Sequence, residues 1–198
     1  MRARTKGPPG QVRIIGGKWK RTPLAVSEAP GLRPTPDRVR ETLFNWLGQS
    51  LEGWHCLDLF AGTGALGLEA ASRGASRVVL VERDRQNCQV LREAIERLKA
   101  HDTVELVEAD AALSLSRLAQ TAPASFDLVF LDPPFSQGWI ARLFGLLEPV
   151  LTDHARLYVE SEAPVSDLPQ PWRVERAGRA GQVHYHLLSR GAGAAPDH

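Results

Sequence analysis

The tetrad Asp-Pro-Pro-Phe at positions 132–135 follows an apolar segment, residues 126–131, with the composition of a buried strand. Two consecutive prolines remove two N–H donors and stiffen the main chain, so the Asp132 carboxylate and the Pro133 carbonyl can face a ligand as acceptors. An amino group on an aromatic base is a weak nucleophile because its lone pair is delocalised into the ring. Two acceptors that hold its hydrogens direct the lone pair at an electrophile, and an aromatic face can stack a flipped-out base. The candidate catalytic residues are Asp132, Pro133, Pro134 and Phe135.

A glycine-rich turn lies at the junction of another apolar strand and a helix, from Asp58 to Gly67. Gly62 and Gly64 allow a tight turn and a close approach to a ligand, and the helix that follows offers free N–H groups. The G-x-G-x-x-G spacing also fits a dinucleotide fold, or a plain strand-to-helix turn with no ligand. On its own this motif therefore indicates a nucleotide-like ligand without selecting one.

Two acidic residues stand at the ends of the next two candidate strands. Glu82 comes 18 residues after Gly64 and can accept hydrogen bonds from both hydroxyls of a ribose, which suits NAD and S-adenosylmethionine equally. The alternative for Glu82 is a solvated strand-end acid. Asp110 can accept from an adenine amino group or cap the helix that begins at Ala111, and the two roles are compatible.

Short apolar segments alternate with helical patterns from residue 54 onward, which predicts an α/β domain with a mostly parallel sheet covered on both faces. The last two strands should form an antiparallel hairpin at one edge. The expected strands are 55–60, 77–82, 103–108, 126–131, 155–160, 172–178 and 182–189. The expected helices are 65–73, 84–100, 111–120 and 138–151.

The first part of the chain has a different pattern. Residues 12–26 predict two short strands around a Gly-Gly turn, and Pro36 opens a helix whose apolar residues fall on one face. Those apolar residues are Val39, Leu43, Phe44 and Leu47. We expect a flexible basic tail at 1–11, an extension at 12–48, a ligand-binding domain at 49–190 and a frayed tail at 191–198.

Positive charge is concentrated at the beginning of the chain. Residues 1–40 contain ten Lys or Arg and two acidic residues, although the net charge of the whole chain is only +1. This asymmetry favours a polyanionic partner for the extension. For residues 1–10 a solvated, disordered tail explains the charge equally well.

Length and composition narrow the class of protein. The 198 residues suit one domain, and 43% hydrophobic with 24% charged residues is ordinary for a globular chain. We find no apolar run that spans a bilayer and no secretory signal pattern, so a cytoplasmic protein without a membrane partner is expected. Cys56 and Cys88 lack metal-site spacing and are expected to be buried free thiols, with no metal bound.

The glycine turn and the tetrad together resemble the Rossmann-like S-adenosylmethionine-dependent methyltransferases that act on amino nitrogens. Further stretches resemble one branch, the RsmD family, which methylates N2 of one guanine in 16S ribosomal RNA. The resemblance covers about residues 12–190, and the arginine-rich stretch 31–45 is its most specific part. The matching stretches are 13–18, 31–45, 57–70, 158–162 and 180–183.

This resemblance implies a role for each matching position. The tetrad would hold the target base, and S-adenosylmethionine would bind at the glycine turn, with Glu82 on the ribose and Asp110 on the adenine. The implied cofactor residues are Asp58, Phe60, Ala61, Gly62, Gly64, Glu82, Arg83, Asp110 and Ala111. The implied contacts to 16S RNA or the small subunit are Lys18, Arg33, Thr35, Arg38 and Arg40. A monomer is expected, and Arg38 or Arg40 has the alternative of pairing with Asp37 or Glu41.

Three other classes of protein share some of these features. An adenine-N6 or protein-glutamine methyltransferase has a related tetrad, more often with Asn first and Tyr last. An NAD-dependent oxidoreductase explains the glycines and Glu82 but gives residues 132–135 no task. A non-catalytic RNA-binding protein explains only the basic extension. Retention of S-adenosylmethionine and not NAD would exclude the last two.

Overall fold

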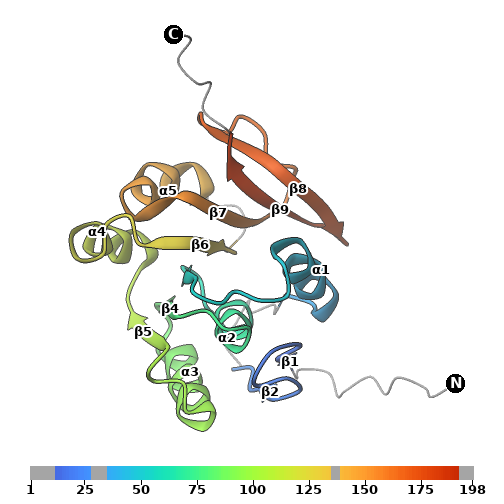
Figure 1. The fold of residues 1–198 in the computed structure, drawn as a ribbon, viewed down its shortest axis with the longest axis vertical. Coiled ribbons are helices and arrows are strands. Elements are labelled where there is room, and N and C mark those ends of the chain that lie inside the picture. Colours follow the sequence, from blue (N-terminus) through green and yellow to red (C-terminus); the bar gives the residue numbers. More distant parts are fainter. Residues whose placement is uncertain (1–11, 28–34, 135–138, 192–198) are drawn as a thin grey trace, which may run out of the picture.

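The computed structural model describes residues 12–27, 35–134 and 139–191. Within them, seven strands form one sheet in the order β5-β4-β3-β6-β7-β9-β8 (Figure 1). The first five are parallel, namely β3 (His55–Asp58), β4 (Arg77–Glu82), β5 (Val104–Glu108), β6 (Phe126–Leu131) and β7 (Leu151–Ser161). The antiparallel hairpin of β8 (Trp172–Ala180) and β9 (Val183–Arg190) completes the edge.

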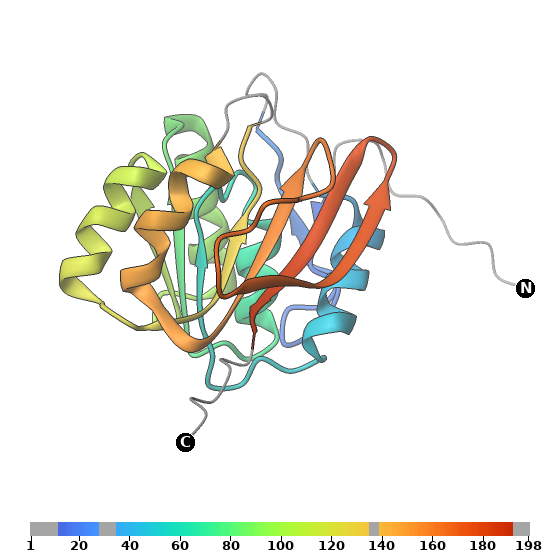
Figure 2. The ribbon, with the colours of Figure 1, turned by 90° about the horizontal axis from the view of Figure 1, so that it is seen from above.

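Helices cover both faces of the sheet, as Figure 2 shows from above. α1 (Asp37–Leu47), α2 (Ala65–Ser72) and α3 (Arg85–Leu98) lie on one face. α4 (Ala111–Thr121) and α5 (Trp139–Leu147) lie on the other, and a 3-10 turn, η1 (Glu148–Val150), leads from α5 into β7. The predicted α/β class with a mostly parallel seven-stranded sheet is confirmed.

Alternation along the strands divides the apolar core into two layers. In β6, Leu128 and Phe130 join the layer under α1, α2 and α3, whereas Val129 and Leu131 join the layer under α4 and α5. All four side chains are fully buried. Strands buried on both faces explain why the sequence shows continuous apolar runs here rather than alternation.

The N-terminal extension packs directly on the sheet domain. β1 (Val12–Arg13) and β2 (Pro23–Leu24) form a short antiparallel pair, and Ile14, Leu43 and Phe44 are fully buried in the same core layer as α2. The predicted hairpin and the predicted apolar face of the helix are confirmed. This part of the extension therefore folds as one body with the sheet.

Element boundaries differ from expectation mainly where the chain leaves the sheet. β3 ends at Asp58 rather than at residue 60, because Leu59 and Phe60 already enter the glycine turn. The helix expected to reach residue 151 ends at Leu147, since Pro149 cannot donate to the preceding turn of an α-helix. Of the helices in the described ranges, none has the length and apolarity to cross a membrane.

Candidate active site

A cavity of about 1070 Å³ opens at the carboxyl ends of the parallel strands. It lies beside the point where the sheet order reverses, between β3 and β6, which is the usual ligand position in open α/β sheets. Most of the predicted site residues meet there, although they come from separate parts of the sequence. Those that line it are Thr35, Asp58, Phe60, Ala61, Gly62, Glu82, Arg83, Asp110, Ala111, Asp132, Pro133 and Pro134.

The glycine turn is shaped by its main-chain conformation. Gly64 has a φ of 75° and stands at the N-terminus of α2, and its N–H donates to the Ala61 carbonyl at 2.6 Å. A Cβ atom at this position would lie 2.7 Å from Leu91 Cδ2 and in a left-handed conformation that disfavours side chains. Gly64 is not among the residues that line the cavity, and its main-chain conformation holds the turn. A contact of Gly64 with the cofactor stays a prediction.

Asp58 lies under the turn and is almost fully buried. Its Oδ2 accepts from the Gly67 N–H at 3.1 Å, whereas Oδ1 completes no hydrogen bond of normal geometry to the described residues. Burial raises the pKa of Asp58 to about 7, and the N–H groups of Gly67 and Phe60 oppose that rise. A buried oxygen with unused acceptor capacity beside the cavity suits a ligand that brings a hydrogen-bond donor.

Glu82 holds the rim of the same turn. Its Oε2 accepts from the Gly62 N–H at 2.8 Å, and its Oε1 accepts from the N–H groups of Arg83 and Asp84 at 2.9 and 2.8 Å. The side chain is half-buried, and both of its oxygens accept from main-chain N–H groups. The ribose contact expected for Glu82 stays a prediction. The carboxylate both orders the turn and lines the cavity.

Asp110 is the N-cap of α4, and its Oδ1 accepts from the Ala112 N–H at 2.9 Å. The predicted capping role is thereby confirmed. Asp110 also lines the cavity, so the residue that caps α4 stands at the site. The adenine contact expected for Asp110 stays a prediction.

The predicted catalytic tetrad meets a second acid that comes from the next strand. Asp132 directly follows β6, and Glu160 lies in β7. The Thr35 hydroxyl reaches both acids, at 3.0 Å from Glu160 Oε1 and 3.5 Å from Asp132 Oδ2. The Tyr158 hydroxyl also donates to Glu160 Oε1, at 2.8 Å. We call these four residues the acid pair cluster; among the described residues, no Lys or Arg side chain forms an ion pair with either acid.

This arrangement makes ionisation of both acids costly. Burial raises the pKa of Asp132 well above its ordinary value, and the charges of Glu160 and then Asp58 raise it further. Burial also raises the pKa of Glu160, although the hydroxyls of Tyr158 and Thr35 oppose the rise. Two neighbouring carboxylates without a cation are typical of functional sites, because such a pair costs stability and gains only when a ligand supplies donors.

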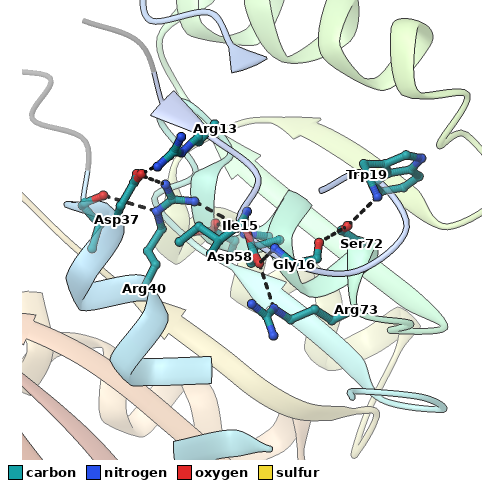
Figure 3. A network of polar contacts seen from close by, with 12 residues as sticks. Arg13, Ile15, Gly16, Trp19, Asp37, Arg40, Asp58, Ser72 and Arg73 are labelled. Atoms are coloured by element: carbon teal, nitrogen blue, oxygen red, sulfur yellow. Dashed lines mark hydrogen bonds and ion pairs between the residues drawn. The ribbon is translucent and has the colours of Figure 1, made fainter. Parts of the chain in front are cut away.

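Arg40 was expected to contact RNA, and this is wrong. Its side chain is fully buried, its Nη2 donates to Asp37 Oδ1 at 2.7 Å, and its Nη1 lies 3.6 Å from Glu69 Oε2 (Figure 3). Its Nε donates to the Thr35 carbonyl at 3.3 Å. Burial lowers the pKa of Arg40, and the charges of Asp37 and Glu69 oppose that change. The alternative of an ion pair with Asp37 is confirmed, so Arg40 positions Thr35 from inside the protein.

The other expected RNA contacts have different positions. Arg38 is exposed on α1, and Thr35 is buried at the cavity wall. The Lys18 side chain is exposed, and the main-chain N–H of Lys18 donates to the Ser72 carbonyl. Ser72 ends α2, so Lys18 lies at the end of this helix that is remote from the glycine turn. Arg33 and Phe135 lie outside the described residues, as do the tail expected at 1–11 and all but the first residue of the tail expected at 191–198.

Several residues of the site were not identified from the sequence. Glu160 and the hairpin residues Arg179 and Gln182 line the cavity, and Glu69 is a buried acid that binds the extension. Glu160 stands in a strand pattern beside Tyr158, and an acid in an otherwise apolar strand is a signal that could have marked it.

The described residues contain no cluster of three or more His, Cys, Asp or Glu that could hold a metal ion. Cys56 and Cys88 are buried and free, as predicted. The polar groups that line this cavity include carboxylates, hydroxyls and the side chains of Arg83, Asn87, Arg179 and Gln182.

Comparison with known proteins places the whole described chain in one family. The family model described as Conserved hypothetical protein 95 matches residues 12–189. Ribosomal RNA small subunit methyltransferase D of Escherichia coli (strain K12) is 46% identical over 192 residues, covering 95% of this chain and 94% of that protein. The protein of the same name from Haemophilus influenzae is 39% identical and covers 92% of this chain and 96% of its own length.

Solved structures agree with the sequence matches. The structure of yhhF from Escherichia coli superposes with a TM-score of 0.79 at 42% identity, covering 91% of this chain and 98% of that one. An RNA methyltransferase from Salinibacter ruber, solved with S-adenosyl-L-homocysteine, has a TM-score of 0.60 at 18% identity and shows the same fold. The chain belongs to the Conserved hypothetical protein 95 family, the RsmD-family methyltransferases of the Rossmann-like class.

Proposed function

We propose that this protein transfers a methyl group from S-adenosylmethionine to the exocyclic N2 of one guanine in 16S ribosomal RNA. The observation that carries the proposal is that Asp132, Pro133 and Pro134 line the same cavity as the glycine turn and Glu82. A base-holding motif and a nucleoside-binding motif on one cavity suit transfer between two bound ligands. The relatives named as small subunit ribosomal RNA methyltransferases support the substrate class.

The residues present fit the cofactor. Glu82, Asp110 and Asp58 all line the cavity, and the buried Oδ1 of Asp58 has no hydrogen-bond partner among the described residues. Glu82 would hold the ribose hydroxyls, Asp110 the adenine amino group, and Asp58 a donor of the amino acid end. When bound, S-adenosylmethionine supplies an electrophilic methyl group on a sulfonium.

The chain's own contribution at the target side is to hold and orient the amino group. The Asp132 carboxylate and the Pro133 carbonyl would each accept one N–H of the amino nitrogen, which aims its lone pair toward the cofactor side of the cavity. The prolines keep the main chain rigid while the nitrogen becomes tetrahedral. Stacking of the base on Phe135 remains part of this proposal.

Among amino-nitrogen acceptors, a base in ribosomal RNA is favoured over adenine N6 in DNA or a protein glutamine. The names of the relatives point to ribosomal RNA, and the exposed Arg38 and Lys18 offer cations for phosphate contact on the extension. We infer further that the protein acts as a monomer in the cytoplasm, on free RNA or on the small subunit, which sedimentation of the purified protein and its complexes would test.

The decisive experiment is a methylation assay on 16S RNA and on small subunits from a strain that lacks this protein. Mass spectrometry of nucleosides from the product should find N2-methylguanosine at a single position. N6-methyladenosine, or labelling of ribosomal protein instead of RNA, would overturn the proposal.

A further inference from the structure

The acid pair cluster contains one carboxylate more than the holding of an amino group requires. Asp132 and the Pro133 carbonyl account for the two amino hydrogens, which leaves Glu160 without a part in the reaction. Glu160 nevertheless lines the cavity, and only 4% of its surface is exposed. Burial of an acid beside another acid costs stability, so the position calls for a functional account.

The hydrogen bonds that Glu160 forms with described residues all involve one of its oxygens, Oε1. The hydroxyls of Tyr158 and Thr35 both donate to Oε1. Among the described residues, no donor reaches Oε2. The side chain is therefore held in one orientation by its neighbours, with an oxygen available to a ligand in the cavity.

The Thr35 hydroxyl lies between Glu160 and Asp132 and contacts both carboxylates. A single hydroxyl hydrogen cannot serve both acids fully, and the shorter contact, 3.0 Å, is the one to Glu160. Arg40 fixes Thr35 from behind by donating to its carbonyl. The two carboxylates are thus held as adjacent hydrogen-bond acceptors.

Two adjacent acceptors are complementary to a base edge that carries two adjacent hydrogen-bond donors. Guanine carries two adjacent donor positions on its Watson–Crick edge, N2–H and N1–H. Adenine and cytosine place an acceptor nitrogen beside their amino groups, and that lone pair would face a carboxylate. Uracil has no amino group.

We propose that Glu160 is a specificity-determining residue that accepts the N1–H of the target guanine while Asp132 accepts from its N2 amino group. This inference rests on the proposed function. Both acids gain a donor when guanine binds, whereas an adenine would leave Glu160 facing a lone pair. Sites built to bind a substrate N–H can reject an analogue that lacks it by a factor of roughly 10⁴.

Replacement of the target guanine by 2-aminopurine tests the contact directly, because this base keeps the N2 amino group but has no hydrogen on N1. The substrate is small-subunit RNA ligated to carry either base, used free or assembled as the wild type requires. The wild type should prefer guanine by on the order of 100-fold or more in kcat/KM. In Glu160→Gln, an amide can donate to the bare N1 of 2-aminopurine, so the preference should shrink at least about tenfold.

Glu162→Gln is the matched control, since Glu162 lines the same cavity but is exposed and has no contact with the acid pair cluster. Its preference for guanine should equal that of the wild type. Glutamine at 160 keeps an oxygen for Tyr158 and Thr35, so thermal unfolding should confirm that this variant is folded.

The outcomes separate the two proposals. If Glu160→Gln loses activity on both bases equally, with the preference unchanged, Glu160 only positions its neighbours and the inference is overturned while the proposed function stands. If the wild type makes no N2-methylguanosine at all, both are overturned. If the preference for guanine over 2-aminopurine shrinks in Glu160→Gln but not in Glu162→Gln, the inference is supported.

Discussion

Two carboxylate centres, one at Glu69 and one at Asp132 and Glu160, are connected through Thr35 and Arg40, and they are built in opposite ways. Glu69 accepts from the N–H groups of Ile15 and Gly16 at 2.6 and 2.7 Å and from Arg73 Nε at 2.8 Å, with Arg40 nearby (Figure 3). The acid pair cluster has two carboxylates, two hydroxyls and no cation in the described part of the chain.

The difference shows that burial alone does not reveal what an acid does. Glu69 is surrounded by donors and does not line the cavity of the candidate site, so its task is to fasten the extension to α2. Asp132 and Glu160 lack such compensation and face open space that a ligand can fill. The first centre should therefore govern stability and the second activity, which variants can test separately.

The largest effect is expected from Glu69→Gln. Removing this charge leaves the buried guanidinium group of Arg73 without its acid, whereas Arg40 keeps its ion pair with Asp37. Breaking a buried ion pair typically costs about 3–5 kcal/mol. Chemical denaturation should show this loss, whereas Glu105→Gln, which breaks an exposed pair with Arg77, should stay within about 0.5 kcal/mol of the wild type. Equal stability of the two variants would mean that Glu69 does not fasten the extension.

The next largest effect is expected from Asp132→Ala, and it should appear in the rate. Loss of an acceptor used in the transition state costs roughly 2.7–4 kcal/mol, which is a hundredfold or more in kcat. Because Asp132 is proposed to hold the base, calorimetry should find S-adenosylmethionine affinity close to that of the wild type. Turnover near the wild-type value would remove Asp132 from the catalytic residues.

Glu82→Ala should have an intermediate effect, because this acid combines features of both centres. It binds three main-chain N–H groups, as a structural acid does, and it faces the cavity. Its loss should weaken S-adenosylmethionine binding by about 1–3 kcal/mol, with turnover partly restored at high cofactor. Unchanged affinity in a calorimetric titration would restrict Glu82 to ordering the turn.

A smaller effect concerns pH. The pKa of Asp132 is raised in the folded protein, so folding favours its protonated form, and its contribution to stability is lost as pH rises from about 4 through the raised pKa. Asp132→Asn stays neutral and should escape this loss. We expect its Tm at pH 8 to exceed that of the wild type, with the gap closing toward pH 4. A constant gap at all pH values would contradict the raised pKa.

The smallest effect is expected from Arg38→Ala. Arg38 is exposed beside the buried Arg40, so the two neighbours form a matched pair on one helix. Loss of one phosphate contact should reduce the slope of log K for RNA binding against log salt concentration by roughly 0.7–0.9. The stability of the protein should change little. Arg40→Ala should instead lower stability. If Arg38→Ala leaves RNA affinity and its salt dependence unchanged, α1 is not a docking element.

Much of the fold followed from local patterns in the sequence. Apolar runs of strand length between helical patterns predicted the parallel sheet, and the β8–β9 hairpin followed from the loss of helices after residue 160. The capping role of Asp110 could also be predicted from the sequence, because a helix cap involves only neighbouring residues. These features depend on interactions within a few residues, which a sequence displays directly.

The tertiary structure decided which charged side chains lie next to one another. The resemblance assigned Arg40 to RNA, but its position on α1 turns it inward, toward Asp37 and Glu69. Glu160 becomes the neighbour of Asp132 only because β6 and β7 are adjacent and parallel, with Leu131 opposite Val159. Contacts between residues far apart in sequence depend on strand order and packing, and no local spacing encodes them. The sequence by itself determined the ligand-binding motifs and the α/β class, while tertiary packing divided the buried charges between stability and chemistry.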